Sequence, residues 1–109
     1  MSMDPAAFTV STVGDDGRVV VVPRGELDLA TAPELETVLR ERLDAGQDVV
    51  VDLRELAFMD STGLRVLVSA HARAGRPRFA VVRPAPGGTV AKLLAIAGVE
   101  DQLEMLDEL

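Results

Sequence analysis

The sequence predicts an α/β domain in which a mixed β-sheet of four to five strands, opening with a β-hairpin, is packed with three to four α-helices. Three observations indicate this fold. Two β-branched segments near the N-terminus flank a turn rich in Gly and Asp. A continuous valine run at residues 49–51 is typical of a strand buried on both faces. Segments with helical and strand-like apolar spacing then alternate along the rest of the chain.

The first two strands are expected to form the hairpin. Apolar and hydroxyl residues alternate from Phe8 to Val13, the turn is Gly14-Asp15-Asp16-Gly17, and the second strand covers Val19 to Val22. The segment 23–28 is then expected to leave the sheet. With 109 residues, the chain is expected to be one domain over residues 1–109, with residues 1–7 as a flexible N-terminal stretch.

Helix starts carry recognisable signals. Thr31, the early Pro33 and Glu34 have the spacing of a capping box, and Gly46 ends the helix that follows. A second helical pattern begins at Leu64 and stops at Gly75-Arg76-Pro77.

The C-terminal third continues the alternation of strand and helix. Residues 79–82 are predicted to form a strand, and Thr89 is expected to cap a third helix that Gly98 ends. The periodicity of residues 102–106 fits a short strand and a helical turn equally well, so both remain open.

Composition limits the classes of function. The net charge of −7 and a pI near 4.5 disfavour direct nucleic-acid binding and anionic membranes, so a protein partner is expected. The absence of Cys excludes disulfides, thiol nucleophiles and Cys-ligated metals, and no metal or cofactor is expected. No export signal and no run of about 18 apolar residues is present, which predicts a cytoplasmic protein without a membrane span.

The stretch Phe58-Met59-Asp60-Ser61-Thr62-Gly63-Leu64 carries the strongest functional signal. It places two hydroxyls beside a carboxylate where an apolar segment meets a helix, so Ser61 or Thr62 is expected at the N-cap. A phosphoryl group there would gain from the same backbone N–H donors and from the helix dipole. Simple capping is the commoner role for such a hydroxyl.

This stretch and the earlier Gly25-Glu26-Leu27-Asp28 resemble the two signature segments of STAS domains, and the match is nearest to the stand-alone anti-sigma factor antagonists of bacteria. The element order agrees from about Phe8 to Leu106. The resemblance implies a STAS-like fold and a non-enzymatic binding protein. When unphosphorylated, it would bind an anti-sigma factor that is also a serine kinase and so free a sigma factor. Phosphorylation at Ser61 would release the complex, and a PP2C-type, metal-dependent phosphatase would restore the binding form.

The residues around Ser61 receive provisional roles in partner binding. Thr62 is a less favoured phosphoacceptor that packs or caps in the first turn, and Asp60 orients the Ser61 hydroxyl or favours the helix dipole. Asp28 lies beside the site by resemblance, or serves only its own turn. Gly63 permits close approach of a partner backbone. Arg65 stands where many family members have Gly, and it reaches a phosphate on the first turn or faces solvent.

Two other functions compete with this hypothesis. A hydrolytic triad would need Ser61 and His71, which are ten residues apart on one predicted helix and therefore about 15 Å apart, and no Gly-x-Ser-x-Gly elbow is present. The sequence therefore argues against an enzyme. The alternative is a non-catalytic STAS subunit of a stress-sensing or membrane lipid-transport complex, without a phosphorylation cycle.

Overall fold

The secondary structure combines six strands with three α-helices and one 3-10 helix in the part of the chain described by a computed structural model, residues 7–14, 17–75 and 78–109. In chain order the elements are β1 (Thr9–Gly14), β2 (Arg18–Leu27), α1 (Ala32–Asp44), β3 (Asp48–Asp52), β4 (Leu56–Met59), α2 (Ser61–Ala74), β5 (Phe79–Val82), α3 (Thr89–Ala97), η1 (Val99–Asp101) and β6 (Met105–Leu106). Parts of three expected features, residues 1–6, 15–16 and 76–77, lie outside the described residues.

The strands form a mixed sheet in the order β1-β2-β3-β5-β6, and β4 pairs with β2 beside this series. β1 and β2 are antiparallel, and every other pairing is parallel. The predicted fold class is confirmed, including the opening hairpin and the central position of the valine run in β3. The sheet has six strands, which is more than expected. The additional strands are short, with four residues in β4 and two in β6, so they leave little pattern in the sequence. β6 also decides the open question at residues 102–106 in favour of a short strand.

β2 is longer than the sequence pattern suggested. The strand was expected to end at Val22, but it continues to Leu27. Its first part, residues 18–21, pairs with β3, and its last part, residues 25–27, pairs with β4. The register shifts between Gly25 and Glu26, where Gly25 has φ +97°. A glycine tolerates this conformation, so β2 bends at the shift and exchanges one parallel partner for the other.

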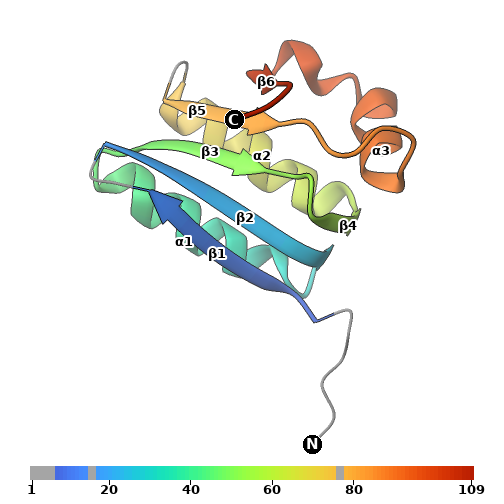
Figure 1. Cartoon of the computed structure of the whole chain (residues 1–109), viewed down its shortest axis with the longest axis horizontal. Coiled ribbons are helices and arrows are strands. Elements are labelled where there is room, and N and C mark those ends of the chain that lie inside the picture. Colours follow the sequence, from blue (N-terminus) through green and yellow to red (C-terminus); the bar gives the residue numbers. More distant parts are fainter. Residues whose placement is uncertain (1–6, 15–16, 76–77) are drawn as a thin grey trace, which may run out of the picture.

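Helices α1 and α2 cover one face of the sheet (Figure 1). Both helices direct an apolar stripe at this face, α1 towards β2 and β3, and α2 towards β4 and β5. The buried side chains of this layer are Leu35, Leu39 and Leu43 of α1, Val66, Leu67 and Ala70 of α2, and Val49 and Val51 of β3. The continuous apolar run of β3 is thus explained by burial on both faces.

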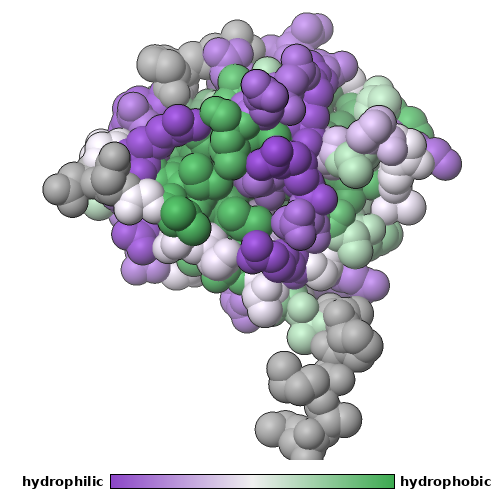
Figure 2. All heavy atoms as spheres, in the orientation of Figure 1, coloured by the Kyte–Doolittle hydropathy of each residue, from purple (hydrophilic) through white to green (hydrophobic). Residues whose placement is uncertain are grey.

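The opposite face of the sheet carries a smaller apolar cluster. Val50, Ala80 and Val82 are buried there, with Val20 and Leu106 packed partly against them. Figure 2 views the molecule from this side and shows a hydrophobic area bordered by hydrophilic side chains. The helices of Figure 1 leave this face open.

Two of the expected N-caps use their hydroxyls differently. Thr31 occupies the N-cap of α1, but its side chain makes no cap hydrogen bond; the Thr31 hydroxyl instead donates to the carbonyl of Glu26 at 2.7 Å. Gly88, rather than Thr89, is the N-cap of α3, and the Thr89 hydroxyl donates to the carbonyl of Ala57 at 3.1 Å. The predicted N-cap position of Thr31 is therefore confirmed and that of Thr89 is wrong, and neither hydroxyl caps its helix because each one reaches a neighbouring strand instead.

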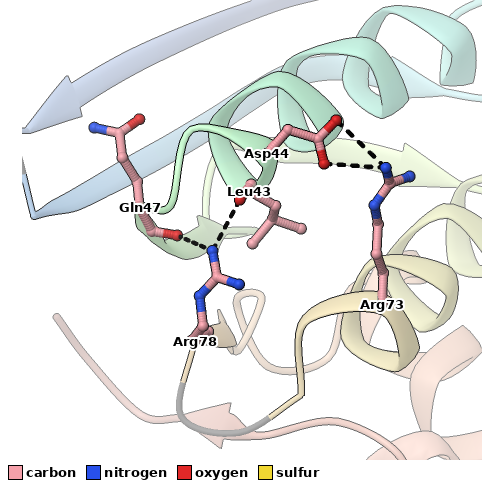
Figure 3. A network of polar contacts seen from close by, with 5 residues as sticks. All are labelled: Leu43, Asp44, Gln47, Arg73 and Arg78. Carbon is pink, nitrogen blue, oxygen red and sulfur yellow. Dashed lines mark hydrogen bonds and ion pairs between the residues drawn. The ribbon is translucent and has the colours of Figure 1, made fainter.

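Two arginines contact the end of α1 near the amino ends of β3 and β5 (Figure 3). Arg73 comes from α2, and Arg78 directly precedes β5. Arg78 Nη2 donates to the carbonyls of Leu43 at 2.9 Å and Gln47 at 3.1 Å. Arg73 pairs with Asp44 at 3.0 Å. We call these five residues the arginine clamp. The clamp adds a side-chain donor to the Leu43 carbonyl, which also accepts from the Gly46 N–H at 3.0 Å, and it joins the end of α1 to the segment before β5.

Candidate functional site

The candidate site lies where β2 and β4 end side by side. Leu27 and Met59 are partners in the parallel pairing, and the backbone N–H of Asp60 donates to the carbonyl of Leu27 at 3.1 Å. Asp28 and Asp60 therefore follow directly after paired residues. Because the carboxyl ends of parallel strands meet at one edge, the two sequence motifs, which are more than 30 residues apart, come together there.

Asp60 is the N-cap of α2. Its backbone is extended, and its carboxylate accepts from the N–H groups of Thr62 at 2.8 Å and Gly63 at 3.2 Å. The expectation that Ser61 or Thr62 occupies the N-cap is wrong, because Asp60 takes that position and both hydroxyl residues lie inside the first turn. These two donors are already used, so a phosphate on Ser61 would not inherit them.

Ser61 is exposed at the first position of α2. Within the described part of the chain its hydroxyl makes no hydrogen bond to another residue. The neighbouring Thr62 is half-buried. Ser61 is thus the more accessible of the two hydroxyls, and it is held on a turn that Asp60 fixes.

Asp28 forms a tight turn of its own between β2 and α1. Its carboxylate accepts from the N–H of Ala30 at 3.0 Å and of Thr31 at 3.2 Å, and the Asp28 N–H donates to the Thr31 hydroxyl at 2.9 Å. Asp28 therefore does act in turn chemistry, one of its two proposed roles. The same turn fixes the loop at the edge of the site.

A groove of about 170 Å³ lies between the start of α1 and the first turns of α2. Leu29 and Pro33 line one side, and Thr62 and Arg65 line the other. Leu29 is 75% exposed, and Phe58 at the end of β4 is 39% exposed. Neither side chain is a predicted site residue, although the place of Leu29 directly after the Gly25–Asp28 segment is a signal that could have indicated it.

Gly63 is buried in the first turn of α2. A Cβ built there would lie 2.7 Å from the Leu27 side chain and 2.8 Å from that of Met59. The glycine lets α2 begin directly on the ends of β2 and β4, which is an interior reason for its presence. Its contact with a partner stays a prediction.

Arg65 is exposed one turn after Ser61 and makes no hydrogen bond or ion pair within the described ranges. Residues four apart on a helix are neighbours on its surface. The Arg65 guanidinium is therefore available both to a phosphate on Ser61 and to an acidic partner.

A third aspartate, Asp52, ends β3. Its carboxylate accepts from the N–H of Arg54 at 3.0 Å and from the Arg54 guanidinium at 2.9 Å through each oxygen. These hydrogen bonds hold the pKa of Asp52 below its usual value, against the opposing effect of burial. The pair fixes the turn that leads from β3 to β4.

The structure offers no support for a triad. His71 lies ten residues beyond Ser61 on α2, which corresponds to about 15 Å along a helix axis. Its Nε2 is buried and has no hydrogen-bond partner among the described residues. In the same part of the chain, no group of three or more His, Asp or Glu side chains is arranged to hold a metal ion. None of the described helices is both long and apolar enough to span a bilayer.

Comparison with known proteins agrees with this architecture. Residues 10–107 match the family model described as "Mlab, STAS domain". The chain therefore belongs to the STAS domain family. Within that family, it is similar to the anti-sigma-B factor antagonist of Staphylococcus aureus, with 31% identity over 99 residues that cover 90% of this chain and 92% of the relative.

Solved structures show the same fold. An anti-sigma factor antagonist from Mycobacterium paratuberculosis superposes with a TM-score of 0.84 at 27% identity, covering 97% of this chain and 91% of that one. The phosphorylated form of the Bacillus cell fate determinant SpoIIAA has a TM-score of 0.62 at 22% identity, with 94% and 93% covered. The second likeness concerns the fold alone.

Proposed function

We propose that this protein is an anti-sigma factor antagonist controlled by phosphorylation of Ser61. In its unphosphorylated form it binds an anti-sigma factor that is a serine kinase, and so frees a sigma factor. The observation that carries the proposal is the exposed Ser61 hydroxyl, which has no intramolecular partner in the described chain and sits on a turn fixed by Asp60. The relatives named above as anti-sigma factor antagonists support its regulatory part.

The partner surface combines apolar and charged groups around Ser61. Leu29 and Phe58 offer exposed hydrophobic contacts, and the groove beside Arg65 offers a recess next to a cation. The turns of Asp28 and Asp60 hold this surface in one arrangement, so little ordering is needed when the partner binds. Gly63 and Thr62 contribute by placing the first turn of α2 against the sheet.

Phosphorylation at Ser61 acts locally. The kinase transfers the γ-phosphoryl group of ATP to Ser61 Oγ, ADP leaves, and the hydroxyl proton passes to a base of the kinase. The phosphate adds about −1.5 to −2 charge at the centre of the interface. Asp60 already occupies two N–H donors of the first turn, so the new charge meets a carboxylate rather than open donors. A loss of about 2.7 kcal/mol weakens binding roughly a hundredfold. A PP2C-type phosphatase restores the binding form.

The test combines phosphosite mapping with binding. Incubation with the cognate kinase and ATP is expected to label Ser61, and Ser61→Ala is expected to abolish the label while Thr62→Ala retains it. By calorimetry, Ser61→Ala should keep the kinase affinity and Ser61→Asp should lose most of it. Labelling at neither hydroxyl, or equal affinities for Ser61→Ala and Ser61→Asp, contradicts the proposal.

One observation favours a second candidate. The description of the matching family model names Mlab and does not name an anti-sigma factor antagonist. The alternative is therefore a non-catalytic STAS subunit of a stress-sensing or membrane lipid-transport complex. In that case Ser61 belongs to a docking surface without a phosphorylation cycle. A pull-down that recovers such a complex, with no phosphate on Ser61 in mass spectra, would favour this alternative.

A further inference from the structure

α3 exposes apolar side chains on its outer face. Ile96 is 85% exposed, the adjacent Ala95 and Ala97 are also exposed, and Lys92 is the one charged residue of the helix. A helix that is apolar on nearly all sides is normally covered by other protein. Figure 2 shows a second hydrophobic area on the side where Figure 1 places α3, separated from the sheet-face cluster by hydrophilic side chains.

A groove of about 190 Å³ borders the same helix. Its walls are mostly apolar and include Pro86, Ala91, Ala95 and Met105, and the ion pair of Arg83 with Glu100 also contributes. Ala95 lines this groove, and Ile96 is the next residue along α3. Consecutive residues of a helix lie about 100° apart around its axis, so the exposed Ile96 and the groove are on adjacent faces of α3.

Charged residues of opposite sign precede and follow Ile96 in the chain. Lys92, the only lysine of the chain, lies four residues before Ile96, and the exposed Asp101 lies five residues after it. In the described residues neither side chain makes an ion pair or a side-chain hydrogen bond. A two-fold axis near Ile96 would bring Lys92 of each copy to Asp101 of the other. The dimer would then contain two equivalent ion pairs.

We propose that α3 is a self-association surface and that its occupant is a second copy of this chain. The two α3 helices pack antiparallel, and each Ile96 enters the groove beside α3 of the other copy. A second copy fits better than an unrelated protein because one copy carries both halves of each contact: the exposed Ile96 and a groove on the adjacent face of α3, and the cation Lys92 and the anion Asp101. Ser61 lies on α2, outside this surface, so the proposal stands independently of phosphorylation.

The small area of this surface limits the affinity of the dimer. A nine-residue helix is about 13 Å long, so the buried area falls at the low end of protein interfaces. The dimer is therefore weak and its population depends on protein concentration.

Sedimentation velocity over a concentration series tests the surface. The wild-type chain is expected to shift from monomer to dimer as concentration rises, and Ile96→Glu is expected to weaken association by about tenfold or more, because it would bury a charge. Val13→Glu is the matched control: Val13 is 67% exposed on β1, so the same charge there should leave association unchanged. A wild-type chain that stays monomeric up to millimolar concentration overturns the proposal, as does an Ile96→Glu variant that associates normally.

Charge reversal tests the pairing. Lys92→Glu and Asp101→Lys are each expected to weaken association, and the double variant Lys92→Glu/Asp101→Lys is expected to restore it. A carbodiimide cross-link between Lys92 of a ¹⁵N-labelled copy and Asp101 of an unlabelled copy would report the same contact by mass spectrometry. Failure of the double variant to recover association, with both single variants weakened, overturns the antiparallel arrangement.

Discussion

The two ends of the sheet are held together in different ways. At the carboxyl ends of β2, β3 and β4, a strand ends in or is followed by an aspartate: Asp28, Asp52 and Asp60. Each carboxylate accepts from the backbone N–H two residues further along. These contacts are local, so each turn fixes itself with few neighbours.

At the amino ends of β3 and β5 the contacts are long-range. Arg78 reaches carbonyls that are 35 and 31 residues away, and Arg73 reaches an aspartate 29 residues away. A guanidinium bonds two carbonyls at once because its donors form a fixed fork. The arginine clamp therefore ties three separate segments, while the carboxyl end leaves Ser61 exposed on a self-contained turn. We infer that the carboxyl end can bind a partner without disturbing the rest of the fold.

The largest expected change in stability concerns the packing of Gly63, at the carboxyl end of the sheet. Gly63→Val should lower the free energy of unfolding by about 2–3 kcal/mol, because a Cβ there meets the Leu27 and Met59 side chains within 3 Å. Gly63→Ala should cost less, since alanine adds less volume and favours the helix. Urea denaturation of the two variants checks the order. A valine variant as stable as the wild type would show that α2 can move off the sheet freely.

The next effect lies in the arginine clamp. Arg78→Ala leaves the carbonyls of Leu43 and Gln47 without their shared donor and should lower the free energy of unfolding by about 1–2 kcal/mol. Arg78→Lys should recover only part of this, because an ammonium lacks the planar fork. Denaturation curves measure both variants. Equal stability of the alanine and lysine variants would argue against the two-carbonyl contact.

Loss of a local cap should have a smaller effect. Asp60→Ala removes the acceptor for the Thr62 and Gly63 N–H groups and should cost about 1 kcal/mol. Asp60→Asn keeps an oxygen in place and is the matched control, with a loss of a few tenths of a kcal/mol. Amide hydrogen exchange in the first turn of α2 reports the same change locally. Unchanged exchange in Asp60→Ala would mean that another group caps α2.

The smallest effect is a pH dependence at Asp52. Its folded-state pKa is below the ordinary value, so its stabilisation is present above about pH 4 and is lost as the pH falls towards the folded-state pKa. The difference in unfolding free energy between wild type and Asp52→Asn should therefore shrink below about pH 4. Urea denaturation from pH 6 to pH 3 measures this difference. A difference that stays constant over that range would argue against the Asp52–Arg54 hydrogen bonds.

The same contrast explains what the sequence could predict. The hairpin, the valine strand and the three α-helices follow from local patterns, and so does a helix that begins close to Ser61. The exact cap did not follow, because Asp60, Ser61 and Thr62 are three suitable capping residues in a row and only the extended backbone of Asp60 selects one. β4 was missed because four residues carry little periodicity. The arginine clamp had no local signal, since its donors and acceptors lie about 30 residues apart.

β2 also has a consequence for the order of assembly during synthesis. It can pair with β1 as soon as the hairpin has formed, but its parallel partners begin only at Asp48 and Leu56. Such distant pairings form later than local ones. The end of β2 that carries Asp28 therefore gains its place in the sheet only after residues 56–59 have been made. A ribosome-bound chain shorter than this can form the hairpin but not the edge at which Asp28 and Asp60 come together.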